Sequence, residues 1–211
     1  MLIVHHLGKS QSERIVWLCE ELEIPYQLDR HARDAVTGLA PADYKALHPM
    51  GTAPVITDGD VVLAESGAII EYLLARYGNG RLVVAPDAPG YADYVYWLHF
   101  AQGTMMPTEM VAMVAAILGA EGKRIEPLLR RRRLATAMIE DRLGQMPYFA
   151  GEAFTAADIA MLFGLTTMRY FVPHDLADFP HIRAYLARIG ERPAYRRAMA
   201  AGDPDMELLL S

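Results

Sequence analysis

The fold is decided by residues 50–66, which read Met50-Gly51-Thr52-Ala53-Pro54-Val55-Ile56-Thr57-Asp58-Gly59-Asp60-Val61-Val62-Leu63-Ala64-Glu65-Ser66. Two apolar segments, 55–57 and 61–63, flank the dipeptide Asp58-Gly59. This arrangement predicts two antiparallel strands joined by a tight type I′ turn. Pro54 stands at the start of the first strand, where a residue without an N–H is tolerated. The segment therefore predicts a β-hairpin that is entered through a proline.

A helix is predicted directly after the hairpin. Apolar residues recur there at helical spacing, at Ile69, Ile70, Leu73, Leu74 and Tyr77. Ser66 stands where an N-cap is expected. A helix N-terminus offers free N–H groups and a partial positive charge, so the start of this helix, beside Glu65, is a predicted binding site for a carboxylate.

The run Gly-Thr-Ala-Pro-Val, the Asp-Gly turn and the following Ala-Glu-Ser-Gly-Ala-Ile resemble the glutathione-binding half of cytosolic glutathione transferases. Together with the segments described below, the resemblance covers essentially the whole chain. It implies an N-terminal thioredoxin-like domain, a cis peptide bond between Ala53 and Pro54, and glutathione as cosubstrate. It also implies that Glu65 and Ser66 contact the γ-glutamyl group, while the backbone of Ala53 pairs with the peptide part of glutathione.

One residue departs from the family pattern. Many members carry Lys or Gln where this chain has Thr52, and in them this residue binds the glycine carboxylate of glutathione. Thr52 is retained as a candidate contact, and Lys9 or Lys45 could supply the missing charge.

Composition limits the classes of function. A net charge of −6 disfavours nucleic acid as the main partner. The single cysteine, Cys19, excludes a disulfide framework and favours a reducing compartment, so we expect a cytoplasmic protein. The N-terminal residues lack the pattern of a signal peptide. The most apolar stretch, 95–118, is interrupted by polar residues and Pro107, so it predicts buried helix and no membrane span.

The order of predicted elements supports two domains, an α/β domain followed by an all-α domain. Strands at 2–4 and 26–28 alternate with helices at 12–22 and 41–47, ahead of the hairpin and its helix, and this is the order of a thioredoxin-like domain. Gly78-Asn79-Gly80 and the Pro- and Gly-rich residues 86–90 mark a linker, and nearly everything after Tyr91 has a helical pattern. We therefore expect a glutathione-binding domain at 1–80, a linker at 81–90 and an all-helical domain at 91–211.

The helical domain contains one strong local signal, Phe154-Thr155-Ala156-Ala157-Asp158-Ile159. Thr155 as N-cap with Asp158 three residues later predicts a capping box. The same run is typical of the helical domain of glutathione transferases. We interpret Asp158 as structural.

The catalytic group is expected after the first strand, in the run His5-His6-Leu7-Gly8-Lys9-Ser10-Gln11-Ser12-Glu13-Arg14. No tyrosine precedes Tyr26, and Cys19 lies inside the predicted helix, which disfavours tyrosine-type and cysteine-type transferases. Ser-Gln-x-x-Arg resembles the serine-type, theta-like class, in which this serine, here Ser10, contacts the glutathione sulfur. The residue types alone leave another interpretation open, because Ser10-x-x-Glu13 also fits a capping box and Ser12 could cap the same helix.

A second substrate would lie against the helical domain. Met106, Met110 and Met113 repeat at helical spacing with Met105 beside them, and methionine suits a pocket for varied apolar ligands. Tyr170 is a further candidate. The alternative is that these methionines form ordinary core.

The resemblance implies a serine-type glutathione transferase of detoxification. Ser10 would stabilise the thiolate, which attacks a small hydrophobic electrophile, and the protein would be a homodimer. No metal is expected, because His5 and His6 are adjacent in a strand and face opposite sides. Two alternatives remain open: glutathione-dependent peroxide or disulfide reduction, and a non-catalytic glutathione-binding adaptor on the same fold.

Overall fold

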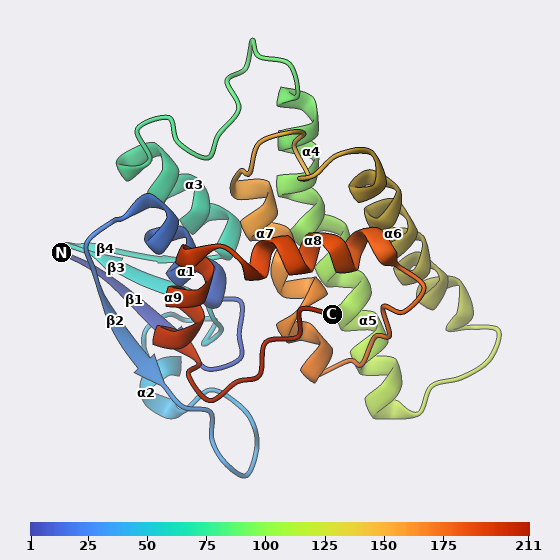
Figure 1. Cartoon of the computed structure of the whole chain (residues 1–211). Helices are drawn as coiled ribbons and strands as arrows, with labels where there is room; N and C mark the ends of the chain where they lie inside the picture. Colours follow the sequence, from blue (N-terminus) through green and yellow to red (C-terminus); the bar gives the residue numbers. More distant parts are fainter. The chain divides into compact units, whose positions relative to one another are not determined.

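The computed structural model describes residues 1–211, which form two compact units. The first unit comprises Met1–Leu82 and Glu191–Glu207, and the second comprises Val83–Gly190 and Leu208–Ser211. Each unit is described by itself below (Figure 1).

The first unit is built on a four-stranded mixed sheet with the strand order β2-β1-β3-β4. Its strands are β1 (Leu2–Leu7), β2 (Tyr26–His31), β3 (Val55–Asp58) and β4 (Val61–Ala64). Strand β1 pairs in parallel with β2 and antiparallel with β3, and β3 pairs antiparallel with β4. The connecting helices are α1 (Glu13–Leu22), α2 (Ala42–Lys45) and α3 (Ser66–Tyr77). The predicted thioredoxin-like order of strands and helices is confirmed.

The hairpin turn differs from its prediction by one residue. Asp58 belongs to β3, where it pairs with Val61, so the two loop residues are Gly59 and Asp60. Only Gly59 has a positive φ, 60°, whereas a type I′ turn requires positive φ at both central residues. The carboxylate of Asp58 accepts hydrogen bonds from the hydroxyls of Tyr72 and Tyr77, which hold this residue in the strand against α3.

Helix α9 (Pro193–Gly202) joins the first unit from near the end of the chain, where Figure 1 shows it beside α1. The ring of Tyr195 meets that of Trp17 edge-on at 5.1 Å. Arg192 donates two hydrogen bonds, of 2.7 and 2.8 Å, to the carboxylate of Glu21 on α1. We expected residues 191–207 in the helical domain, and the structure instead groups them with the sheet, because the buried face of α9 packs on α1. The rest of the predicted division, including the linker at 81–90, stays a prediction.

The second unit is helical. It contains α4 (Tyr91–Phe100), a π-helical turn (Ala101–Met105), α5 (Met106–Leu118), α6 (Glu126–Gln145), α7 (Ala156–Leu165), a 3₁₀ turn (Thr167–Tyr170) and α8 (Pro180–Gly190). A π-helical turn stands just before Pro107, and in it the Met106 N–H donates to the carbonyl of Ala101. A π turn widens the backbone next to a proline that cannot donate a helical hydrogen bond. None of the helices combines the length and the apolar character that a membrane crossing requires.

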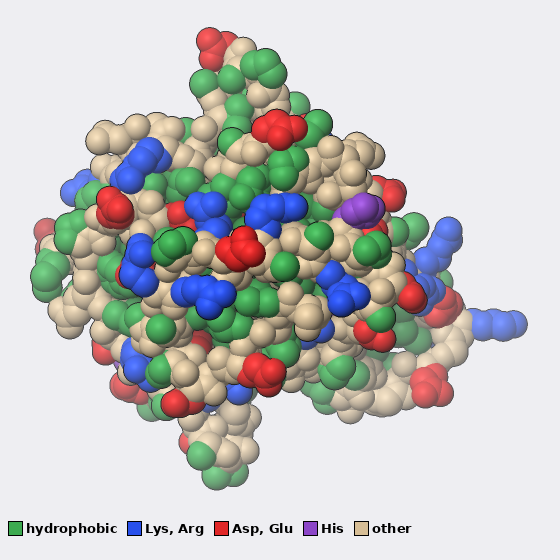
Figure 2. Space-filling view, viewed as in Figure 1, with side chains coloured by type: hydrophobic (Ala, Val, Ile, Leu, Met, Phe, Trp, Pro, Cys, Tyr) green, Lys and Arg blue, Asp and Glu red, His purple; other side chains and the backbone are tan.

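The face drawn in Figure 2 has no large patch of side chains of a single charge sign. Lysine and arginine side chains alternate there with aspartate and glutamate. This mixture is what a chain with 20 basic and 26 acidic residues presents when both signs are interspersed.

Helix α7 is buried along its whole length, and the predicted capping box at its start is confirmed. The Thr155 hydroxyl accepts from the Ala157 N–H at 3.3 Å, and the Asp158 carboxylate accepts from the Thr155 N–H at 2.9 Å. Asp158 also accepts from the Phe149 N–H at 3.1 Å and the Tyr185 hydroxyl at 3.3 Å. The aspartate therefore ties the cap to a loop and to α8, besides capping its own helix.

Asp158→Ala is expected to lower the free energy of unfolding by about 2–6 kcal/mol. The substitution leaves two buried backbone N–H groups without an acceptor, and each such group costs roughly 1–3 kcal/mol. Chemical denaturation measures the loss, with Asp178→Ala, on the exposed surface of the same unit, as the control.

The pH dependence of the free energy of unfolding provides a second test of the role of Asp158. Burial raises the pKa of Asp158 to about 6, against the opposing effect of the hydrogen bonds from Thr155 and Phe149. The unfolded value is about 3.9. Between those values the folded protein binds more protons than the unfolded chain, so the contribution of Asp158 to stability falls as pH rises from about 4 to about 6. Asp158→Asn should flatten this part of the profile, and an unchanged profile would contradict the assignment.

Candidate functional site

The sheet register brings together the segments that the sequence singled out. The peptide bond between Ala53 and Pro54 is cis, as expected. Val55, the next residue, pairs with His5 of β1 on one side and with Ala64 of β4 on the other. Because both pairings are antiparallel, Ala53 and Pro54 lie between the end of β1 and the residue that follows β4, which is Glu65.

Helix α3 begins one residue earlier than predicted. Glu65 is its N-cap residue, so the expectation that Ser66 is the N-cap is wrong, and Ser66 is the first helical residue. Glu65 has a φ of 69°, a conformation that costs a non-glycine residue about 1–3 kcal/mol and is concentrated at functional sites. No side chain caps this helix. Glu65 is exposed, whereas Ser66 is buried.

A buried arginine connects α1 to this helix start. Nη1 of Arg14 donates to the hydroxyl of Ser66 at 3.4 Å and also to the side chain of Gln11. Burial lowers the pKa of Arg14 to about 10, while Glu13 acts in the opposite direction, so the guanidinium stays charged at neutral pH. The start of α3 therefore has a positive group behind it in addition to its own dipole.

Of the two lysines considered near Thr52, Lys45 is the one that the structure places beside it. A Cβ atom on Gly51 would lie 3.1 Å from Cγ of Lys45, so the lysine stem packs against the residue preceding Thr52. Lys9 lies elsewhere, at the rim of a cavity, and its N–H donates to Asp203 at 3.1 Å.

Neither serine of the first helix acts as a conventional cap. Ser12 is the N-cap residue of α1 but makes no capping bond with its side chain. Its hydroxyl instead accepts from the N–H of Leu7 at 3.1 Å. The Ser10 hydroxyl accepts from the Ser12 N–H at 3.2 Å and lies 2.7 Å from the Ser12 hydroxyl. The Ser12 side chain is therefore hydrogen-bonded to the end of β1, and the two serine hydroxyls contact each other.

The two serines are connected by hydrogen bonds to a buried histidine and, through it, to an aspartate. Nδ1 of His6 lies 2.9 Å from the Ser12 hydroxyl, and Nε2 lies 3.0 Å from Oδ2 of Asp203, just after α9. Two glycines leave room for this contact. A Cβ on Gly8 would lie 3.2 Å from Oδ1 of Asp203, and one on Gly202 would lie 3.1 Å from Nε2 of His6. The result is a continuous chain of side chains from Asp203 to Ser10.

His5, the neighbour of His6, belongs to a separate network on the opposite face of the sheet, as strand alternation predicts. Its Nδ1 and the Nε2 of His31 each lie 3.1 Å from Oδ2 of Asp29, and Nδ1 of His31 lies 3.1 Å from Oδ2 of Asp43. The nitrogen and oxygen atoms of His5, Asp29 and His31 lie within 4.8 Å of one another and are joined by these hydrogen bonds. The network ties β2 and α2 to β1.

The chain is similar to known proteins over most of its length. The N-terminal domain model of glutathione S-transferases matches residues 10–76, and the C-terminal domain model matches residues 104–193. Glutathione S-transferase 3 of Schizosaccharomyces pombe is 32% identical to the chain, over 94% of this chain and 86% of its own length. The chain belongs to the glutathione transferase family. Glutathione S-transferase 3 of Zea mays is 31% identical, over 75% of each chain. A crystal structure of a glutathione S-transferase from Actinobacillus pleuropneumoniae is 38% identical, with a TM-score of 0.88 over 96% of this chain and 93% of that one.

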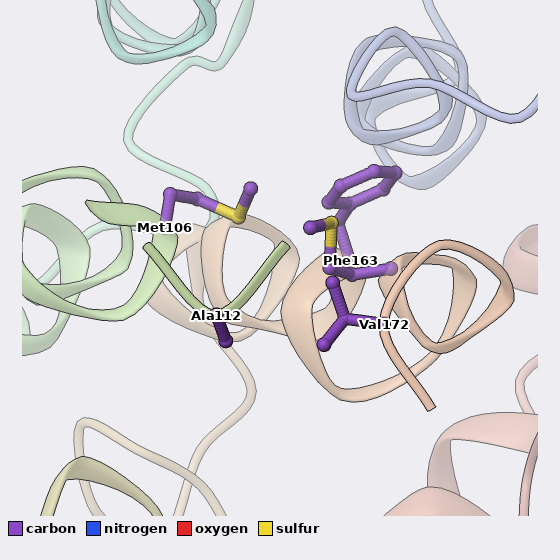
Figure 3. Close-up of a cluster of buried hydrophobic side chains, with 5 residues drawn as sticks. Met106, Ala112, Phe163 and Val172 are labelled. Carbon is purple, nitrogen blue, oxygen red and sulfur yellow. The ribbon is translucent and has the colours of Figure 1, made fainter. Parts of the chain in front are cut away.

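The methionines proposed for a second substrate of this glutathione transferase fall into two groups. Met105 and Met106 are buried, Met105 against Gly164 of α7. Figure 3 shows Met106 in a cluster with Ala112, Phe163 and Val172, which Met113 also packs against. These three methionines form core, the alternative that the sequence left open.

Two candidates for the second substrate remain accessible within the helical unit. Met110 is 44% exposed and Tyr170 is 39% exposed. Met110 lines an apolar cavity of about 330 Å³ formed by α5, the beginning of α6 and the loop between them.

One cavity of the first unit lies beside the hydrogen-bonded side chains of His6 and Asp203. It has a volume of about 690 Å³ and is lined by residues that include His6, Lys9, Arg30, Arg33 and Asp203. Ser10, Ala53 and Glu65 do not line it, so cavity size alone does not identify the residues expected to contact glutathione.

The sequence does not single out His6 and Asp203 as residues of the candidate site. His6 was considered only for metal binding, and nothing near Asp203 indicates chemistry, because its sequence context is that of a helix end. Its partner lies 197 residues away in the chain. The one usable signal was His6 at the inward-facing end of a buried strand, six residues before a serine.

Proposed function

We propose that this chain is a serine-type glutathione transferase, in which Ser10 stabilises the glutathione thiolate for attack on a small apolar electrophile. The observation that carries the proposal is the position of the Ser10 hydroxyl. It lies beyond the end of β1, it does not cap α1, and it is the outermost hydroxyl of a buried hydrogen-bonded chain. A group held in this way is preorganised to contact a ligand.

The choice between Ser10 and Ser12 rests on hydrogen-bond capacity. Ser12 is fully buried and its hydroxyl already contacts the Leu7 N–H, His6 and Ser10. Ser10 accepts from one backbone N–H and contacts one hydroxyl, which leaves it capacity for a further partner. Ser10 is therefore the serine assigned to the sulfur.

The γ-glutamyl end of glutathione is assigned to the start of α3. The carboxylate of Glu65 would pair with its ammonium group, and Ser66 with the uncapped helix N-terminus would hold its carboxylate. Arg14, behind Ser66, adds a positive charge on the same side. The backbone of Ala53, turned by the cis bond to Pro54, would pair with the peptide part.

The glycine end is assigned to Thr52 and Lys45. Thr52 has no charge, and the position of Lys45 against Gly51 supports this lysine as the cation that replaces the Lys or Gln common at position 52 in the family. The carboxylate of glycine would then be held by an ammonium group from α2.

The energetics require no metal. Lowering a thiol pKa from about 8.5 by two units takes about 2.7 kcal/mol of preferential thiolate stabilisation. One hydrogen bond to an anion supplies roughly 1.5–3 kcal/mol. A nearby helix N-terminus adds roughly 0.3–1 kcal/mol.

The electrophile is proposed to bind on the helical unit, with Met110 and Tyr170 as the accessible contacts. Detoxification of small hydrophobic electrophiles by a cytoplasmic homodimer is the role that the family suggests. Reduction of peroxides or disulfides by glutathione would use the same thiolate, and a binding protein without turnover would use the same Glu65 and Ser66.

Ser10→Ala is expected to raise the pKa of bound glutathione by one unit or more and to lower turnover at neutral pH at least tenfold, since one pKa unit is about 1.4 kcal/mol. Affinity for the peptide should survive, because its other contacts remain. The ultraviolet absorbance of the bound thiolate, titrated against pH, measures the pKa. Ser10→Thr, which keeps the hydroxyl, is the matched control. If Ser10→Ala leaves both the titration and the rate unchanged, Ser10 does not contact the sulfur.

Glu65→Gln is expected to weaken glutathione binding by about 1.5–3 kcal/mol, the range for a hydrogen bond between charged groups. The substitution keeps the size of the side chain and removes only its charge. Calorimetry measures the affinity, with Glu71→Gln on the exposed side of the same helix as the control. Equal affinities for the two variants would exclude the assigned role of Glu65.

A further inference from the structure

The side chains of Ser10, Ser12, His6 and Asp203 form one unbroken hydrogen-bonded chain, and we propose that it transfers the proton of the glutathione thiol to His6. The inference rests on the proposed function, because it assumes that the sulfur binds at Ser10. It adds a base to a site in which the serine by itself can only donate a hydrogen bond.

The hydroxyl of Ser12 determines the direction of every proton in the chain. A serine hydroxyl has one proton and two lone pairs. The N–H of Leu7 occupies one lone pair at 3.1 Å. Its two closest partners are Ser10 Oγ at 2.7 Å and His6 Nδ1 at 2.9 Å, whereas the carbonyl of Leu7 is 3.4 Å away. Ser12 therefore donates to one of these two close partners and accepts from the other.

Two arrangements satisfy all the partners. In the first, Ser10 donates to Ser12, Ser12 donates to Nδ1 of a neutral His6, and Nε2–H of His6 donates to Asp203. In the second, Nδ1–H of His6 donates to Ser12 and Ser12 donates to Ser10, so that the Ser10 proton points outward. Asp203 accepts from Nε2 in both arrangements, so His6 in the second carries both ring protons and is an imidazolium.

The two arrangements differ by one proton, and the thiol supplies it. The S–H proton moves to Oγ of Ser10, the Ser10 proton moves to Oγ of Ser12, and the Ser12 proton moves to Nδ1 of His6. The products are a thiolate that accepts a hydrogen bond from Ser10 and an imidazolium that is paired with the Asp203 carboxylate. No proton leaves the site, and a neutral thiol and imidazole become an anion and a cation.

Asp203 is suited to stabilise that cation. Its side chain is 10% exposed, and besides His6 it accepts from the Lys9 N–H. Burial by itself would raise the pKa of Asp203, but the hydrogen bond and charge of His6 and the Lys9 N–H outweigh burial, so the pKa is lowered. The aspartate thus stays ionised at neutral pH and does not compete for the proton.

Some of the other groups near His6 favour a positive charge on its imidazole ring, and others disfavour it. Arg30 pairs with His6 in the β1–β2 register, and Lys9, Arg33 and His31 line the adjoining cavity with it. These groups disfavour a further positive charge. Asp205, in the same lining, favours one. Only Asp203 is hydrogen-bonded to the imidazole besides Ser12, so Ser12, His6 and Asp203 are positioning residues that act through Ser10.

The first experiment follows the thiolate titration of bound glutathione in Asp203→Asn and His6→Gln. Asp203→Asn keeps an acceptor for the Lys9 N–H, and His6→Gln keeps a polar side chain that cannot take up a proton. Both are expected to raise the pKa of bound glutathione by at least one unit and to lower kcat at neutral pH at least tenfold, with little change in glutathione affinity. Asp205→Asn removes a nearby carboxylate that is not hydrogen-bonded to His6, so it should raise this pKa much less than Asp203→Asn does.

A second experiment uses the wild-type protein and does not depend on how the variants fold. Calorimetry in buffers of different ionisation enthalpy counts the protons released when glutathione binds, while absorbance reports the thiolate. If the proton moves along this hydrogen-bonded relay to His6, a thiolate forms with almost no release of protons to the buffer. NMR of nitrogen-labelled imidazole rings should then show that His6 becomes an imidazolium when glutathione binds. S-methylglutathione, which has no thiol proton, should leave His6 neutral.

The outcomes separate this inference from the proposed function. If Ser10→Ala raises the thiol pKa while Asp203→Asn and His6→Gln do not, the serine role stands and the relay is overturned. Release of one proton to solvent per thiolate formed, with His6 still neutral, overturns it as well. A wild-type protein that binds no glutathione overturns the proposed function and the relay together.

Discussion

The pairing of β1 with two strands at once is the constraint on which the proposed site depends. Because β1 is hydrogen-bonded to β2 on one side and to β3 on the other, its end is fixed relative to both. The cis Ala53–Pro54 bond is held beside that end by the register of β3, and Glu65 is held beside the cis bond by the register of β4. Ser10 follows three residues beyond this fixed end of β1.

Strand alternation gives the same strand two chemically separate faces. His5 is committed to a network with Asp29 and His31 that fastens β2 to β1, and His6 is committed to Ser12 and Asp203. One-residue slippage of β1 would exchange these partners, and two buried histidines would lose their hydrogen bonds. Burying unpaired polar groups is costly, so the register is specified by polar contacts as well as by apolar burial.

The methionines that repeat at helical spacing in α5 are buried at some positions and exposed at another. Met106 and Met113 pack with Phe163 in the core, whereas Met110, between them in sequence, is 44% exposed and borders a cavity. Helical spacing places these residues on neighbouring parts of one face, but only the packing of the neighbouring helices decides which of them is buried. Asp158 is buried at the start of α7, where its hydrogen bonds connect three segments that the apolar contacts alone would not orient.

Local patterns in the sequence determined the order of strands and helices, the hairpin, and the capping box of Thr155 and Asp158, because each depends on residues within a few positions of one another. The family resemblance added the cis bond before Pro54. The sequence misplaced the start of α3 by one residue, because a positive φ at a non-glycine residue such as Glu65 is not indicated by the residue type. Only the tertiary structure decided that α9 packs on α1 and that Asp203 reaches His6. The apolar stripe of α9 shows that one face must be buried but does not specify against which helix, and a hydrogen bond across 197 residues leaves no local trace.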